Sequence, residues 1–231
     1  MAIGYSYLGK GSLNNNVGNT IVVTTLADIN VGDTVVWGAW CSSAQTLSSV
    51  TDSGGNTYTP LSTPFVLGTD RLYQIHIKAT NAVATGGTVT FTFSSTSGRK
   101  AVIGSVVTGL DSTSYLDQVG VGANDTTASP TITTGTLATA NSLILTHMFI
   151  TSPLAVITED SDYSWIDDAI FDNRTLHLAT REVNSTSPDT YNPSLAASAS
   201  WMLNYIVLKG AGATPPVTTD GDLIFLFGVG D

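Results

Sequence analysis

The sequence has few charged residues and only one cysteine. Lys, Arg, Asp and Glu make up 11% of the 231 residues, whereas an average soluble domain contains roughly 25%. The formal net charge is −10 and no Lys or Arg cluster offsets it locally, so the chain would repel a phosphate backbone and we expect no nucleic-acid partner. The lone Cys41 excludes an internal disulfide, and the apolar run before it predicts a buried, structural thiol.

Long hydrophobic runs and recognisable catalytic motifs are also missing. No apolar run approaches the roughly 18 residues that a membrane helix needs, and the first residues lack the basic and apolar regions of an export signal. The sequence contains no serine-nucleophile elbow, no phosphate-binding loop with a Gly-Lys-Ser/Thr ending and no cysteine pair for zinc. We therefore expect no membrane partner, no cofactor and no enzymatic activity.

What the chain has instead is hydroxyl groups and glycine. Thr occurs 35 times, Ser 24 times and Gly 22 times. Thr suits a β-strand because its branched side chain fits the pleat, with the hydroxyl toward water while a neighbouring Val or Ile faces the core. The composition therefore predicts a β protein whose surface is rich in hydroxyl groups.

Alternating apolar and polar residues predict half-buried strands at 71–78 and 88–93. We expect these two strands to form a hairpin across the loop 81–87, which contains the turn-forming pair Gly86 and Gly87. No stretch has helical periodicity with caps. Further strands are expected at 20–25, 33–41, 100–108, 142–151, 175–183 and 199–209.

The pattern favours one all-β domain, a two-sheet antiparallel sandwich of the jelly-roll kind. The runs 35–41 and 143–150 are almost wholly apolar, which is typical of central strands covered on both faces. Short strands without intervening amphipathic helices favour a sandwich over a parallel α/β fold, and the length exceeds that of an immunoglobulin-like domain. We expect an arm or first strand at 1–19, the sandwich body at 20–209, and extended terminal segments.

The segment 210–231 combines a Gly/Pro linker with an apolar end. Pro215 and Pro216 favour an extended backbone, and the residues after them predict a strand that is apolar on both faces. One interpretation is that this strand completes its own sandwich. The other is that it adds to the sheet of a neighbouring subunit and binds a partner there. Its candidate partner-binding residues are Leu223, Ile224, Phe225, Leu226 and Phe227.

A Gly-rich turn carries the one resemblance to known proteins. In the segment 49–59, Val-Thr-Asp is followed by Gly-Asn-Thr-Tyr, and Asp52 and Asn56 can bond nearby backbone amides. This segment resembles a motif of jelly-roll-like β-sandwich domains in bacteriophage virion proteins and bacterial surface proteins. The segments 106–111 and 201–209 are similar to further landmarks of that group. The matching residues belong to turns and cores, so the resemblance implies a fold and transfers no functional residue.

The densest polar cluster lies at 159–168. Crowded carboxylates can bind a hard cation such as Ca²⁺ or supply the acid and nucleophile of a glycosidase. The spacing does not match an EF-hand, and nothing places two carboxylates across a cleft. We therefore favour a solvated acidic loop, with a cation site and a catalytic pair as alternatives. The candidate metal ligands are Asp160, Asp162, Asp167 and Asp168.

Histidine and tryptophan supply the remaining candidates. His76 and His177 fall on the polar phase of their strands, and His147 falls in an apolar strand. We expect these histidines to lie at the surface or to have their hydrogen bonds satisfied within the protein. None has a second histidine at metal-binding spacing. Trp165, inside the acidic cluster, is the tryptophan expected to be exposed and is a candidate for stacking on a sugar.

Together these features predict a non-enzymatic structural protein of a phage virion, assembled in the host cytoplasm. The first hypothesis is a capsid decoration or cement protein that binds neighbouring capsid subunits. We also expect a homo-oligomer, for which a trimer would suit such a sandwich. The alternative is a carbohydrate- or receptor-binding module of a tail or fibre, which would use Trp165 and nearby carboxylates.

Overall fold

The computed structural model describes residues 2–14, 17–61, 63–151 and 156–212, and it contains no helix in these ranges. Strands account for most of these residues. They are β1 (Gly4–Leu13), β2 (Thr20–Thr24), β3 (Thr34–Cys41), β4 (Leu47–Asp52), β5 (Thr57–Pro60), β6 (Phe65–Leu67), β7 (Asp70–Lys78), β8 (Thr88–Phe93), β9 (Lys100–Thr108), β10 (Leu116–Thr127), β11 (Ile132–Thr133), β12 (Ser142–Ile150), β13 (Ile157–Thr158), β14 (Ser164–Phe171), β15 (Arg174–Val183), β16 (Thr190–Tyr191), β17 (Ser194–Leu195) and β18 (Ala199–Lys209).

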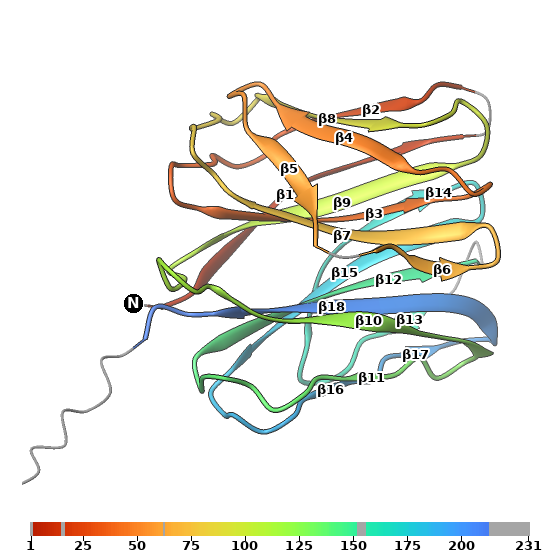
Figure 1. Ribbon diagram of the computed structural model, residues 1–231. Coiled ribbons are helices and arrows are strands. Elements are labelled where there is room, and N and C mark those ends of the chain that lie inside the picture. The colour runs from red at the N-terminus through yellow and green to blue at the C-terminus, as the bar shows by residue number, and fades with distance from the viewer. Residues whose placement is uncertain (1, 15–16, 62, 152–155, 213–231) are drawn as a thin grey trace, which may run out of the picture.

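The chain is an all-β antiparallel sandwich, as predicted. Its first half forms a nine-stranded sheet in the order β1-β9-β3-β7-β5-β4-β8-β2, with β6 paired to β7. Its second half forms a five-stranded sheet in the order β10-β18-β12-β15-β14. Figure 1 shows the larger sheet curling over the upper part of the molecule, with the smaller sheet below it and the short pairs β11–β16 and β13–β17 beneath that.

Three apolar cores follow from this layering. Trp37 and Phe91 meet edge to face inside the curled sheet, with ring centroids 5.0 Å apart. Trp40 stacks on Phe149 between the two large sheets, with centroids 4.1 Å apart. A third core lies between the five-stranded sheet and the short strand pairs, around the buried Tyr191. Strands β3 and β12 are buried at every residue, which confirms the prediction that they are central strands.

The prediction that β7 and β8 form a hairpin is wrong. Strand β7 pairs with β3, β5 and β6, whereas β8 pairs with β2 and β4. The loop between β7 and β8 explains this pairing. Val83 in the loop exchanges backbone hydrogen bonds of 2.8 and 2.9 Å with Ile29, and Thr25 donates a backbone hydrogen bond to Gly87 and accepts one from Gly86. The loop is thereby held to the segment that follows β2, and β8 continues beside β2.

Other predictions from the sequence have mixed outcomes. Cys41 is fully buried, and burial raises the pKa of its thiol to about 12, as a structural thiol requires. Residues 4–13 form a true first strand, β1, paired with β9. The segment 213–231, with its expected terminal strand, lies outside the described residues. No helix among the described residues is long and apolar enough to cross a membrane.

Candidate functional site

A two-residue turn places an aspartate opposite a histidine. Asp172 and Asn173 both adopt positive φ angles, 34° and 66°, the conformation of the tight turns that match the twist of a β-hairpin. They join β14 to β15 so that Asp168 pairs with His177. Part of the predicted acidic loop is therefore an edge strand. The prediction of a loop was wrong there because the turn lies beyond the acidic cluster and draws residues 164–171 into the sheet.

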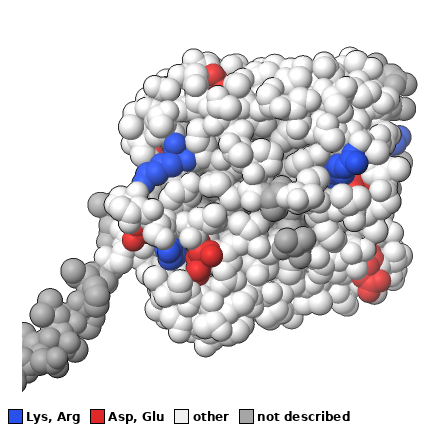
Figure 2. Space-filling view, in the orientation of Figure 1, with Lys and Arg blue, Asp and Glu red and all other residues white. Residues whose placement is uncertain are grey.

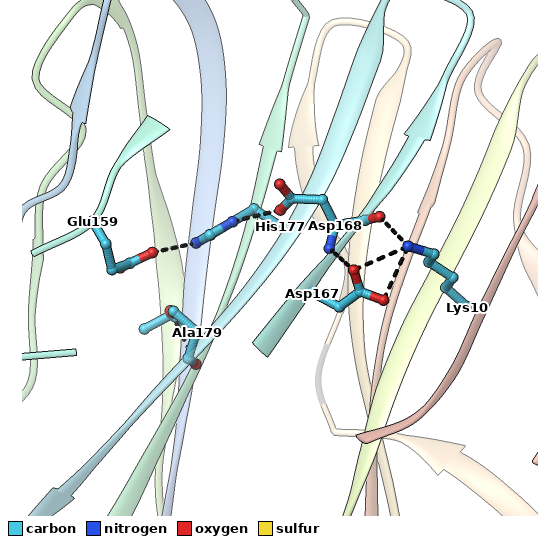
Figure 3. Close-up of polar contacts among 7 residues, drawn as sticks. Lys10, Glu159, Asp167, Asp168, His177 and Ala179 are labelled. Atoms are coloured by element: carbon cyan, nitrogen blue, oxygen red, sulfur yellow. Dashed lines mark hydrogen bonds and ion pairs between the residues drawn. The ribbon is translucent and has the colours of Figure 1, made fainter. Parts of the chain in front are cut away.

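His177 is held between two carboxylates. Its Nδ1 lies 2.6 Å from Oδ1 of Asp168, and its Nε2 lies 2.8 Å from Oε2 of Glu159. The imidazole side chain is only 1% exposed, whereas the two carboxylates are about one-fifth exposed. Figure 3 shows the ring lying between them, with Glu159 on one side and Asp168 on the other. Both ring nitrogens face acceptors, so the doubly protonated ring fits this geometry best.

The two carboxylates decide the charge of the histidine. Burial is the largest single influence and by itself lowers the pKa of His177, because a charged ring loses its hydration. The hydrogen bonds and negative charges of Asp168 and Glu159 together outweigh burial and raise the pKa to about 9. His177 is therefore a cation at neutral pH. A ring that already carries both protons cannot act there as a general base.

A β-bulge brings a tryptophan to the same side of the sheet as this cluster. The pairing register shifts between Trp165 and Asp167. Without the shift, Trp165 and Asp168, three residues apart, would point to opposite faces. With it, both line one groove of about 380 Å³ together with Val156, Ile157, Glu159 and His177. The Trp165 side chain is 58% exposed, which confirms the predicted exposure.

Asp167 faces the other way and joins the two large sheets. Its Oδ1 accepts a hydrogen bond of 3.0 Å from Nζ of Lys10 on β1, and its Oδ2 forms an ion pair of 2.9 Å with the same group. The Lys10 ammonium group also donates to the backbone oxygen of Asp168 at 2.8 Å. These contacts appear to the right in Figure 3. Burial raises the pKa of the Asp167 carboxyl, but the hydrogen bonds from Lys10 and Tyr7 outweigh it and lower the pKa overall.

The other two candidate metal ligands lie in the loop before β14. Asp160 accepts hydrogen bonds from the backbone amides of Asp162 and Asn192. Asp162 forms an ion pair of 3.2 Å with Arg181. The four predicted aspartates thus have four different sets of protein partners and do not converge on one point. Within the described ranges, no group of three or more His, Cys, Asp or Glu side chains is arranged to hold a metal ion.

Two of the three histidines, His147 and His177, are buried. His177 was expected at the surface or with its hydrogen bonds satisfied, and the second alternative holds, because the ring is buried with Asp168 and Glu159 bonded to its two nitrogens. The sequence contains a signal for the pairing of His177 with Asp168. A two-residue turn at Asp172-Asn173 makes Phe171 and Arg174 the flanking pair, so the residues three positions before and three positions after that pair lie opposite each other. His147 is fully buried in β12, and burial together with the charge of His177 lowers its pKa to about 3.

No protein-family model and no curated protein matches this chain. The site must therefore be interpreted from its own chemistry. It offers an exposed indole ring, two carboxylates that hold a buried imidazolium, and two apolar side chains, Val156 and Ile157, around one groove. Such a groove combines an apolar surface with a few fixed polar groups, as small-molecule sites do.

Proposed function

We propose that this chain is a non-enzymatic structural protein of a bacteriophage virion. In the first instance it is a capsid decoration or cement protein that binds neighbouring capsid subunits, acts without a cofactor and is incorporated during assembly in the host cytoplasm. The observation that carries the non-enzymatic part is His177, whose two ring nitrogens are both engaged by carboxylates. A ring that is doubly protonated at neutral pH is not available there as a general base, and its place between two carboxylates suits a cluster that orients groups for binding.

The surface supports attachment to other proteins. Figure 2 shows a face on which charged side chains are few and lie mostly toward the two ends. The segment from Val17 to Val31 exposes four large apolar side chains around β2, those of Val17, Val22, Leu26 and Val31. Exposed apolar side chains suit a contact that buries surface against a partner, and Asp28 is the one charged residue between Val17 and Val31.

Analysis of purified particles tests the decoration function. The expected result is that the protein is present in fixed stoichiometry with the major capsid subunit, and that particles assembled without it lose resistance to heat or low salt. Particles that lack the protein, or that are equally resistant without it, would contradict the proposal. Binding of the purified protein to capsids stripped of it would supply the complementary measurement.

The segment after Lys209 gives a second, separable test. A chain truncated after Lys209 keeps β18 complete, so the body should remain folded. If residues 223–227 bind a partner, light scattering should show a smaller oligomer, or the truncated chain should no longer attach to particles. An unchanged oligomer together with unchanged attachment would place the partner-binding surface elsewhere on the molecule.

The second candidate function is a carbohydrate- or receptor-binding module of a tail or fibre. Trp165 favours it, because a large aromatic side chain that is 58% exposed beside two carboxylates offers a ligand both a stacking surface and hydrogen-bond acceptors. Electron microscopy of particles labelled with an antibody against the protein distinguishes the two functions. Label over the capsid shell supports decoration, and label confined to the tail or fibres supports the binding module.

A further inference from the structure

The groove at His177 has an aromatic platform on one side. Trp165 protrudes from the bulged edge strand β14. Val156 and Ile157 line the same groove, and Val156 is also exposed. The volume of about 380 Å³ falls in the range of roughly 300–1,000 Å³ that small-molecule sites occupy. A ligand with one flat apolar face can therefore stack on the indole ring and remain partly open to water.

The polar groups of the groove favour a ligand that donates hydrogen bonds. Asp168 contributes its carboxylate and Glu159 contributes Oε2, whereas Oε1 of Glu159 is buried, and carboxylate oxygens accept hydrogen bonds. The buried His177 ring holds both carboxylates in place through bonds of 2.6 and 2.8 Å. Because their positions are set before a ligand arrives, little side-chain entropy is lost on binding. Several hydroxyl groups on one ligand would match these fixed acceptors.

The charge of the groove selects against anions. Two carboxylates and one imidazolium leave one net negative charge, and neither Lys nor Arg is among the residues that line the groove. The nearby Arg181 is already paired with Asp162 and Asp189. Lys10 contacts Asp167 and the backbone of Asp168 from the direction of β1, away from His177 (Figure 3). The formal charge of −10 on the whole chain adds to this repulsion.

We propose that this groove binds neutral pyranose sugars and rejects anionic ones. The apolar face of the sugar ring stacks on Trp165, and its hydroxyl groups donate to Glu159 and Asp168. The inference rests on the carbohydrate-binding candidate function and gives it a ligand class. It does not depend on the capsid decoration function, since a decoration protein can present the same groove on the outside of a particle.

Glycan-array binding with the purified full-length chain tests the proposal. The array should hold neutral hexopyranose oligosaccharides and matched forms that carry sialic acid, uronic acid or phosphate. The expected result is binding to members of the neutral set and loss of binding to their acidic counterparts. Preferential binding to the acidic set, or no binding to any neutral pyranose, would overturn the proposal.

Three variants identify the groove as the site. Trp165→Ala should weaken binding by at least about tenfold, because the stacking surface is lost, whereas Trp165→Phe should retain part of the affinity. Ile170→Ala is the matched control, since Ile170 is an exposed apolar residue on the same strand but does not line the groove. Undiminished binding by Trp165→Ala would overturn the proposal.

Incorporation into particles is measured in parallel. Trp165→Ala should be incorporated as well as the wild-type chain, because the mutated ring is not part of the predicted capsid-binding segment. If no neutral sugar on the array binds but the chain is incorporated into particles normally, the sugar site alone is rejected. Sugar binding without any incorporation would instead reject the virion function and leave the groove as assigned.

Discussion

The imidazole of His177 lies 2.6 Å from the Asp168 carboxylate although the two residues are nine positions apart in the chain. The Asp172–Asn173 turn closes that distance by pairing β14 with β15. Glu159 completes the cluster from a separate segment at 2.8 Å. One ion cluster therefore joins the β14–β15 hairpin at the sheet edge to the segment that precedes it. The stability of this cluster depends on the charge of the His177 ring.

Stability should decrease at alkaline pH because of His177. The pKa of His177 is raised to about 9 in the folded protein from an ordinary value of 6.5. A raised pKa means that the stabilisation is fully present below about pH 6.5 and is lost as the pH rises through 9. At about 1.4 kcal/mol per pH unit, the loss should approach about 3 kcal/mol. Urea unfolding between pH 6.5 and 10 measures it.

The variant His177→Gln is the control for that experiment. It should be less stable than the wild type at pH 7, because a neutral amide cannot donate to both carboxylates as a cation does. It should also lack the decrease in unfolding free energy around pH 9. A wild-type protein whose stability stays constant to pH 10 would contradict the charged cluster.

His147 should make the folded protein less stable at acid pH. Its pKa is lowered to about 3 in the folded protein, first by burial and then by the charge of His177. The unfolded chain therefore binds a proton below about pH 6.5 that the folded protein excludes, so stability decreases as the pH falls. Between pH 6.5 and pH 4, the unfolding free energy of His147→Leu should decrease by about 3 kcal/mol less than that of the wild type. Parallel acid unfolding curves for the two proteins would refute this role.

Gly38 allows His147 to pack between the two sheets. A Cβ atom at Gly38 would lie 2.2 Å from Cδ2 of His147, far inside van der Waals contact. Gly38→Ala should therefore destabilise the protein by about 1–3 kcal/mol, as overpacking of a core does. Gly212→Ala is the control, because a Cβ there meets nothing within 4 Å. Chemical denaturation of both variants measures the difference, and equal stabilities would show that the core adapts at Gly38.

Asn56 holds the Gly-rich turn to a neighbouring loop. Its buried side-chain oxygen accepts hydrogen bonds from the backbone amides of Thr80 and Asn81, at 3.0 and 2.9 Å, and its amide nitrogen donates to Asp52 at 2.8 Å. Asn56→Ala leaves these groups unpaired and should cost about 2–4 kcal/mol in unfolding free energy. The exposed Thr57→Ala should change stability little. A similar small effect of both substitutions would show that water replaces the lost bonds.

The sequence by itself predicted the type of fold and most central strands. Residues 88–93 and 100–108 form strands with the predicted bounds, because alternation and apolar runs depend on which face of one strand is buried. The burial of Cys41 and the exposure of Trp165 also follow from their immediate neighbours. The bonds that the Asp52 carboxylate accepts from the backbone amides of Gly54 and Asn56 were predictable for the same reason, since both partners are close in the chain. The bonds of the Asn56 side chain to residues 80 and 81 are long-range and were not predicted.

Only the tertiary structure decided which strands pair and what surrounds each polar residue. Strand β8 has the predicted alternation but pairs with β2 and β4, because the segment before it is held to residues 25–29. His177 has the polar phase of a surface residue, yet Asp168 and Glu159 make its burial as a cation possible. Local patterns report the two faces of a strand, whereas a partner is chosen by long-range packing, hydrogen bonding and charge that no short window of sequence contains.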